Sequence, residues 1–227
     1  MSELPLYAVA ERLMRYVTID TTSDPESDQF PSSEKQLNLS RLLVEEMKAM
    51  GVEDVVLNAD GYVIARIPSN ISEVVPVICF CSHVDTAPDC SGTDVKPILH
   101  ARYTGQDIHL PDDPAQVIRM ADYPYLQNHI GKAIITASGK TLLGADDKSG
   151  VAIIMDTIAH LQHHTQIPHG ELVIVFTPDE ETGRGTERLS VAALGANVGY
   201  TLDGGELGSY EEETFSADEV TITIDGV

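Results

Sequence analysis

The chain has 227 residues, of which 42% are hydrophobic and 22% are charged, as in ordinary globular proteins. Its 14 basic and 36 acidic residues give a formal net charge of −22, a field that repels nucleic acids and anionic membrane surfaces, so we expect neither as a partner. No apolar run approaches the roughly 20 residues of a membrane span, and the first residues lack the features of a signal peptide. Together with only three cysteines, these features predict a cytoplasmic protein.

The first third of the chain predicts two helices, a hairpin and a buried strand. Apolar residues recur at helical spacing over residues 7–17 and again over residues 34–50. The apolar runs 55–57 and 62–65 are separated by Asn-Ala-Asp-Gly, which favours a hairpin with an Asp-Gly turn. Residues 74–82 are nearly all apolar, which is typical of a central strand buried on both faces.

Residues 88–130 are rich in Pro, Asp, Tyr and His and show no clear periodicity, so we expect an excursion over the surface. Beyond it, apolar spacing predicts three more strands and two more helices. The strands are expected at 133–136, 172–176 and 198–202, and the helices at 149–164 and 187–194. This alternation indicates an α/β fold, with a mostly parallel mixed sheet flanked by helices on both faces.

The last residues behave differently from the rest of the chain. Residues 220–225 alternate apolar and polar side chains, which predicts a strand with one apolar face. The sequence stops two residues later, and nothing follows that would cover this face. We therefore expect a chain that looks cut short, with an unpaired strand that is prone to association.

Side chains able to bind metal follow several of the predicted strands. His83, the pair Glu180 and Glu181, and Asp203 each come after an apolar strand, and Asp146 opens a helix. In a parallel sheet the carboxyl ends of the strands meet at one edge, where ligands gather. One imidazole and several carboxylates at such an edge are what a two-metal hydrolase requires.

Each motif has a chemical interpretation and a structural one. His83 offers a neutral imidazole nitrogen, and Asp85 can accept the other ring proton and so select the tautomer. Asp146 can bridge two cations at the roughly 3.5 to 4 Å spacing of two-metal sites. Taken alone, a His-x-Asp pair is usually structural and an Asp-Asp-Lys is usually a solvated loop, so the argument depends on their common location.

The acidic pair after the strand at 172–176 suggests a division of labour. Glu180 and Glu181 are adjacent, so their side chains diverge, and one can bind metal while the other takes a proton from water. Asp203, before two glycines, can complete the ligands of one metal. The structural alternatives are an acidic turn after a proline and an ordinary Asp-Gly-Gly turn.

At these residues the sequence resembles the peptidase T family, the bacterial tripeptide aminopeptidases among the co-catalytic zinc metallopeptidases. The resemblance extends along nearly the whole chain, in the family's order. The matching stretches are His83–Gly92, Thr141–Gly150, Ile167–Gly170, Phe176–Glu181 and Thr201–Gly205. The resemblance implies part of a zinc-peptidase catalytic domain at residues 1–207, followed at 208–227 by the first strand of a smaller α+β lid domain.

The resemblance also implies two Zn²⁺ ions in a complete active site. His83 and Asp203 would hold one zinc, Asp146 would bridge the two ions, and Glu181 would hold the second. The family takes the remaining ligand of the second zinc from a histidine near a distant C-terminus. This chain contains no counterpart of that histidine.

The implied reaction is hydrolysis of a tripeptide with release of its N-terminal residue. Glu180 is the implied general base, and Asp85 is the implied partner of His83. Because most of the lid and the late histidine have no counterpart, we expect an incomplete chain that associates with the missing C-terminal portion or with itself. The expected substrate is a small peptide.

Two other functions stay open at this point. A truncated and catalytically silent product would retain metal binding through His83, Asp146 and Asp203. A related zinc dipeptidase or amino-acid deacylase would use the same metals on a different substrate, although the excursion at residues 88–130 favours the peptidase T family.

Overall fold

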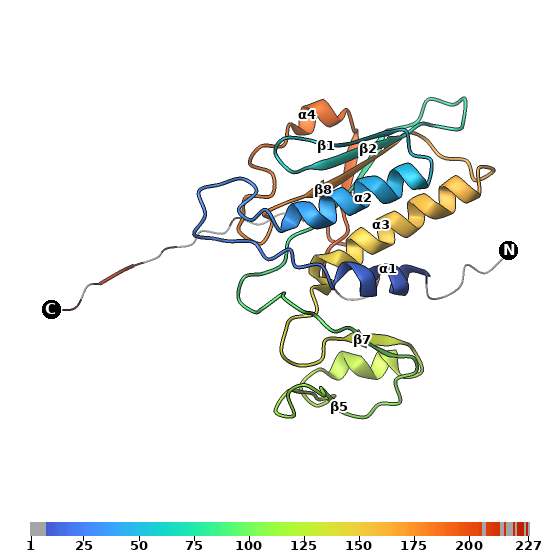
Figure 1. The fold of residues 1–227 in the computed structure, drawn as a ribbon. Coiled ribbons are helices and arrows are strands. Elements are labelled where there is room, and N and C mark those ends of the chain that lie inside the picture. Colours follow the sequence, from blue (N-terminus) through green and yellow to red (C-terminus); the bar gives the residue numbers. More distant parts are fainter. Residues whose placement is uncertain are drawn as a thin grey trace.

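The computed structural model describes residues 8–205, 208–213, 216, 220, 222–224 and 226. Figure 1 shows a twisted sheet with α1, α2 and α3 on one side, α4 on the other, and a smaller body around β5 and β7. The elements in chain order are α1 (Ala8–Tyr16), α2 (Gln36–Ala49), β1 (Asp54–Leu57), β2 (Val63–Ile67), β3 (Ile78–His83), β4 (Ile98–His100), β5 (Ile108–His109), β6 (Val117–Ile118), the 3-10 helix η1 (Pro124–His129), β7 (Ile134–Thr136), α3 (Ala145–His163), β8 (Leu172–Thr177), α4 (Val191–Leu194) and β9 (Val198–Thr201).

The central sheet has five strands in the order β1-β2-β8-β3-β9. The pairs β1/β2 and β2/β8 are antiparallel, whereas β8/β3 and β3/β9 are parallel. The predicted α/β fold with a mixed sheet flanked by helices is confirmed, but parallel pairs form half of this sheet rather than most of it. Because β3, β8 and β9 run in the same direction, their carboxyl ends lie at one edge.

The predicted hairpin is present as β1 and β2. The side-chain oxygen of Asn58 accepts the backbone N–H groups of Asp60 and Tyr62, at 3.0 and 2.9 Å, which closes the turn. Gly61 adopts a φ of +84°, a conformation that glycine reaches without steric cost. The Asp-Gly turn thus orients β2 to pair with β8.

The central strand β3 is shorter at its start than the expected run 74–82. Val74 is fully exposed, and Pro76 has no N–H with which to pair in a sheet. Val77 bonds instead to the segment before β9, where its N–H donates to the Asn197 side chain at 2.8 Å. Regular pairing therefore begins at Ile78 and ends at His83, the first of the predicted site residues.

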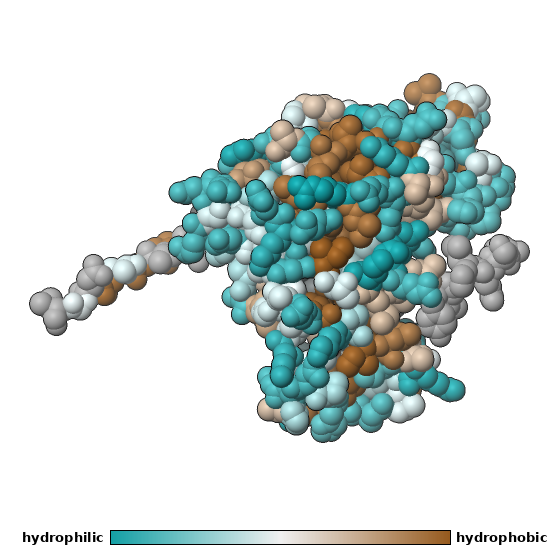
Figure 2. Space-filling model, in the orientation of Figure 1, coloured by the Kyte–Doolittle hydropathy of each residue, from teal (hydrophilic) through white to brown (hydrophobic). Residues whose placement is uncertain are grey.

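The main core lies between the sheet and helices α1 to α3. Buried residues of this core come from α2, β2, α3 and β8, with Leu43, Val63, Met155 and Phe176 each fully buried. A second cluster on the opposite face joins Cys79 and other side chains of β3 and β8 to Leu194 of α4. Most of the surface in Figure 2 is hydrophilic, in keeping with the large net negative charge, with smaller apolar patches over the strands and the lower body.

The segment expected to be a surface excursion has regular structure of its own. It contains two small antiparallel sheets, β4/β7 and β5/β6, and the 3-10 helix η1. Tyr103, Ile108 and Leu126 form a separate small core inside it. The strand predicted at 133–136 exists as β7, but it pairs with β4 and not with the central sheet, because partner choice depends on contacts distant in sequence.

The expectations for the last part of the chain have mixed outcomes. The helix expected at 187–194 is limited to Val191–Leu194, and β9 is present as predicted. The described residues within 220–225 adopt no strand, and Val220, Ile222 and Ile224 are exposed, while residues 221 and 225 lie outside the described part of the chain. The proposed division at residues 207 and 208 stays a prediction. Within the described residues, no helix combines the length and apolar character that a bilayer crossing needs.

Candidate metal centre

The predicted site residues meet at the carboxyl edge of the parallel strands. His83 ends β3, Glu180 and Glu181 lie just beyond β8, and Asp203 lies two residues beyond β9. Asp146 stands at the start of α3, where it and the next residue have non-helical backbone angles before the regular helix begins. The structure therefore brings together all five side chains that the sequence predicted to be near one another.

The His83 imidazole is the centre of this cluster. Its Nε2 atom lies 3.0 Å from Asp146 Oδ1, 3.7 Å from Glu180 Oε2 and 3.8 Å from Asp203 Oδ2. The side chain of His83 is 2% exposed, whereas those of Asp146, Glu180 and Asp203 are 64%, 53% and 40% exposed. A buried imidazole thus faces carboxylates that remain accessible from solvent.

Two groups of donor atoms within the described residues have the spacing of a metal site. His83, Glu180 and Asp203 form one group, and His83, Asp146 and Glu181 form the other, with the donor atoms of each group within 4.8 Å of one another. One imidazole nitrogen with carboxylate oxygens suits a divalent ion such as zinc, so the donor set fits the metal chemistry that the sequence predicted. The grouping differs from the prediction in two respects. Glu180, and not Asp146, lies with His83 and Asp203, and His83 also lies with Asp146 and Glu181.

Asp85 connects the imidazole to the acidic turn. It is fully buried, and its Oδ1 atom lies 3.3 Å from His83 Nδ1. The same carboxylate accepts the backbone N–H of Glu180 at 3.0 Å and that of Glu181 at 3.1 Å. The predicted contact with His83 is therefore present, and the hydrogen bonds to the turn add a second task that the sequence did not suggest.

The cluster shifts the protonation of its members. Burial and the charge of Asp203 raise the pKa of Asp146, and burial together with neighbouring carboxylates also raises the pKa values of Glu180 and Glu181. Burial alone would lower the pKa of His83, but the hydrogen bond and negative charge of Asp85 and other nearby acids outweigh it and raise that pKa to about 10. The raised pKa values of the acids reflect burial and their mutual repulsion, and the charge of His83 partly offsets both.

Two residues beside Asp146 have roles that the sequence did not identify. Asp147 is fully buried, and its carboxylate accepts the backbone N–H groups of His83 and Gly150, both at 3.1 Å. Burial and the charge of Asp203 raise its pKa to about 7. Lys148 is 2% exposed and donates to the Ile19 carbonyl at 2.7 Å. The only available signal was their position next to a proposed ligand.

Close packing at Gly150 brings α3 against the strand ends. A Cβ atom at this position would lie 2.0 Å from the Leu202 carbonyl oxygen and 2.4 Å from Ser82 Oγ. Ser82 in turn donates to that same carbonyl at 2.8 Å. Because Leu202 directly precedes Asp203, the absence of a side chain at Gly150 allows β9 to deliver Asp203 to the cluster.

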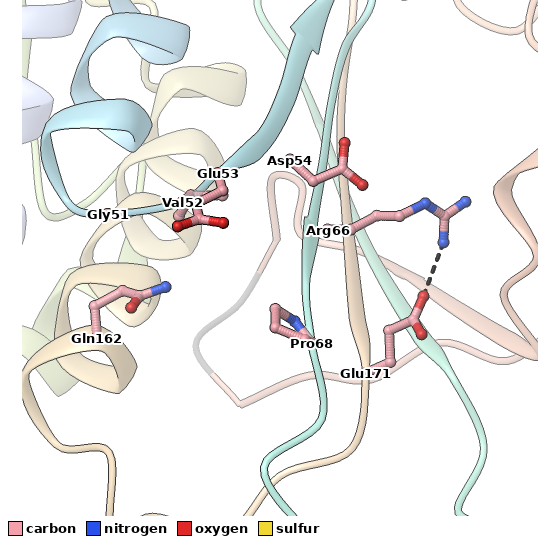
Figure 3. Close-up of a pocket in the computed structure, with 8 residues that line it drawn as sticks. All are labelled: Gly51, Val52, Glu53, Asp54, Arg66, Pro68, Gln162 and Glu171. Carbon is pink, nitrogen blue, oxygen red and sulfur yellow. Dashed lines mark hydrogen bonds and ion pairs between the residues drawn. The ribbon is translucent and has the colours of Figure 1, made fainter.

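A cavity at the other end of the sheet has a different character. Figure 3 shows it between the end of α2, the start of β1 and the segment before β8, with Arg66 and Glu171 paired at 2.9 Å. Its volume is about 400 Å³, and Gly51, Val52, Glu53, Asp54, Arg66, Pro68, Gln162 and Glu171 line it. None of the predicted site residues contributes to this cavity.

The chain is similar in sequence to a family of peptidases. Residues 142–223 match the model of peptidase family M20/M25/M40. A curated protein named Peptidase T from Alkaliphilus oremlandii is 46% identical over 220 residues, which cover 96% of this chain and 54% of that relative. Another Peptidase T, from Desulfitobacterium hafniense, is 48% identical over 219 residues, covering 96% of this chain and 53% of the relative. The chain thus spans about half the length of the curated relatives it matches.

Solved structures agree in fold. The aminopeptidase PepT from Bacillus cereus aligns with a TM-score of 0.61 and 24% identity, over 88% of this chain and 43% of that one. A tripeptidase from Staphylococcus aureus aligns with a TM-score of 0.62 at the same identity and coverage. At this identity the likeness concerns the fold alone. By sequence, residues 142–223 are similar to peptidase family M20/M25/M40, and relatives that match along nearly the whole chain are named Peptidase T.

Proposed function

We propose that this chain supplies the larger part of the active site of a metal-dependent aminopeptidase that acts on tripeptides. The observation that carries the proposal is the convergence of an imidazole and four accessible or half-buried carboxylates at the carboxyl edge of β3, β8 and β9. The names of the homologues support the reaction class, and the tripeptide substrate is taken from the family resemblance and from the name of the Staphylococcus aureus tripeptidase.

Zinc is the proposed metal, with two ions in a complete site. His83 and Asp203 would hold one ion, Glu181 would hold the other, and Asp146 would contact both. When bound, the metal supplies Lewis-acid polarisation of the peptide carbonyl and a lowered pKa for attacking water. In this assignment His83, Asp203 and Asp146 serve the first ion, whereas only Glu181 and Asp146 serve the second. The larger donor set supports stronger binding of the first ion.

Glu180 is the proposed general base. Partial burial raises the pKa of its carboxyl group above the usual value, which makes the carboxylate a better proton acceptor. Its half-exposed side chain reaches the same space as the Asp146 and Asp203 carboxylates. Asp85 is the proposed partner of His83, holding the Nδ1 proton so that Nε2 is free to bind metal.

The proposal is tested with the complete gene product that contains these 227 residues. With zinc added, it should release the N-terminal residue from a tripeptide faster than it cleaves a dipeptide or an N-acyl amino acid, as measured by mass spectrometry. Preferential cleavage of either of the other two substrates would assign the site to a dipeptidase or a deacylase. Binding of metal without any cleavage would favour the catalytically silent alternative.

The role of Glu180 is tested separately with Glu180→Gln. Loss of the base should lower turnover by roughly 10² while the metal content measured by elemental analysis stays unchanged. Glu180 also lies among donors that could share an ion with His83 and Asp203. An equal loss of metal and activity would therefore make Glu180 a ligand and overturn its assignment as base.

A further inference from the structure

The turn that carries Glu180 and Glu181 begins with a buried residue of unusual conformation. Asp179 is fully buried and adopts a φ of +56°, in the left-handed region that non-glycine residues seldom occupy. Such a conformation persists when the surrounding structure holds it in place. The contacts of Asp179 therefore determine where the two following glutamates point.

The carboxylate of Asp179 is held by neutral donors from the start of α2. It accepts the backbone N–H of Ser32 at 2.7 Å, the Ser32 hydroxyl, and the Gln36 side-chain amide at 2.7 Å. Among the described residues, no lysine, arginine or histidine forms an ion pair with it. A buried carboxylate without a cation depends on such hydrogen bonds, so these donors are a condition for its position.

Gln36 binds the turn through both ends of its amide. Its nitrogen donates to the Asp179 carboxylate, and its oxygen accepts the Asp179 backbone N–H at 3.1 Å. Gln36 is fully buried, so neither contact is exchanged with bulk water. The two bonds connect the first residue of α2 directly to the residue that precedes Glu180.

Three consecutive backbone amides of this turn are held by side chains. Gln36 accepts the N–H of Asp179, and the two oxygens of Asp85 accept those of Glu180 and Glu181. The acceptors come from two different elements, the start of α2 and the segment after β3. The backbone amides of Glu180 and Glu181 bond to the Asp85 carboxylate, and the amide before them bonds to Gln36. Each of these three residues of the turn is therefore held by its own hydrogen bond.

We infer that Gln36 is a positioning residue that, through Asp179, sets the direction of the Glu180 and Glu181 side chains toward His83. The inference deepens the proposed function and rests on it for the identity of the base. Asp85 secures the turn from the side of the imidazole, and Gln36 secures it from the opposite side. Loss of either anchor would leave the turn free to rotate, and small displacements of a reacting group cost large factors in rate.

The test uses Gln36→Met, which keeps the length of the side chain and removes both hydrogen bonds. The matched control is Gln29→Met, the same substitution at an exposed glutamine. Amide hydrogen exchange of the metal-free chain should show reduced protection at Glu180 and Glu181 in Gln36→Met, although their acceptor Asp85 is unchanged. The control should exchange like the parent chain.

Kinetics in the complete gene product provide the second readout. Gln36→Met should lower kcat roughly tenfold or more, with KM and metal content within about a factor of two of the parent. Ser32→Ala, which removes one hydroxyl donor and leaves both Gln36 bonds in place, should lower kcat by a smaller factor. It serves as the milder variant if Gln36→Met does not fold.

The outcomes separate this inference from the proposed function. A variant that melts earlier but keeps the parent's kcat and the parent's exchange at Glu180 and Glu181 would reduce Gln36 to a stability role and overturn the inference. Absence of peptidase activity in the parent would overturn the proposed function, while the exchange measurement would still decide whether Gln36 holds the turn.

Discussion

The two ends of the central sheet differ in how their charged side chains are arranged. At the amino end of β8, Arg66 pairs with Glu171 at 2.9 Å (Figure 3). Arg66 also donates to the Leu194 carbonyl at the end of α4 at 2.7 Å. At the carboxyl end, the single imidazole of His83 faces Asp146, Glu180 and Asp203 within 3.0 to 3.8 Å. The amino end places an arginine against one of its acidic side chains, whereas the carboxyl end places one imidazole against three carboxylates.

This difference indicates which end of the sheet offers donor atoms suited to a cation. Paired charges at a surface need nothing further and contribute modestly to stability. Clustered carboxylates repel one another and raise each other's pKa values, so the folded chain is more stable when a cation joins them. The ion pair of Arg66 and Glu171 therefore accounts for part of the amino end, whereas the donor atoms at the carboxyl end are spaced so that they could hold a cation.

The largest expected effect comes from breaking the packing that forms the carboxyl end. Gly150→Ala would place a methyl group 2.0 Å from the Leu202 carbonyl oxygen and 2.5 Å from Asp147 Oδ1. Relief of this overlap has to move α3 or β9, so we expect a loss of about 3 kcal/mol or more in the free energy of unfolding, measured by urea denaturation. Gly199→Ala is the control, because its added Cβ meets nothing closer than 3.9 Å. Equal stability of the two variants would contradict this account.

Metal addition should stabilise the carboxyl end by a slightly smaller amount. Zinc at about 100 times its dissociation constant should raise the free energy of unfolding by about 2.7 kcal/mol, since it binds the folded chain. Thermal unfolding with and without zinc measures the effect. Asp203→Asn should weaken the response because it removes one donor. A full response in this variant would place the metal elsewhere.

The pH dependence of the metal-free chain should reveal the same crowding. The pKa of Asp147 is raised to about 7, so between about pH 4 and pH 7 the folded chain keeps a proton that the unfolded chain has lost. The free energy of unfolding should fall as pH rises through this window. The pKa of His83 is raised from 6.5 to about 10, so above about pH 6.5 the folded chain also keeps a proton that the unfolded chain has lost. The free energy of unfolding should therefore continue to fall from about pH 6.5 upward.

Two aspartate variants isolate the contribution of the carboxyl end to this slope. Asp147→Asn should flatten the dependence between pH 4 and pH 7, as measured by urea denaturation at several pH values in the presence of a chelator. Asp28→Asn, at an exposed position, is the matched control and should leave the slope unchanged. A slope that persists in Asp147→Asn would assign the effect to the overall charge of the chain.

The smallest expected effect concerns the amino end. Arg66→Met removes the ion pair with Glu171 and the contact with the end of α4. Both partners are partly exposed, so we expect a loss of about 1 kcal/mol, again by urea denaturation. The stabilisation by zinc should be the same as in the parent chain. A smaller stabilisation by zinc in Arg66→Met would show that the two ends of the sheet are energetically coupled and would contradict their independence.

Local patterns were sufficient for much of the fold. The long helices α2 and α3 have a strong apolar stripe, and β8 is a short apolar run, so their types followed from periodicity. The site residues followed from their place after such runs. The start of β3 was wrong because Pro76 interrupts pairing within an apolar run. The partner of β7 was not predicted, because a strand of three residues carries no information about its neighbour.

The supporting contacts of the site could not be read from local patterns. Asp179 and Gln36 are 143 residues apart in sequence, and Asp85 and Glu180 are 95 apart. Neither pair shares a motif, and a buried glutamine looks in sequence like any polar residue at the start of a helix. Their roles depend on burial, which converts ordinary polar side chains into necessary partners of one another.

By itself, the sequence determined the elements and the chemical identity of the donors, because periodicity and strand-end positions are local properties of the chain. The tertiary structure alone decided the order of the strands, the half-parallel character of the sheet and the connections from Gln36 and Asp85 to the acidic turn. These features depend on hydrogen bonds and packing between residues far apart in sequence, which exist only once the sheet has assembled.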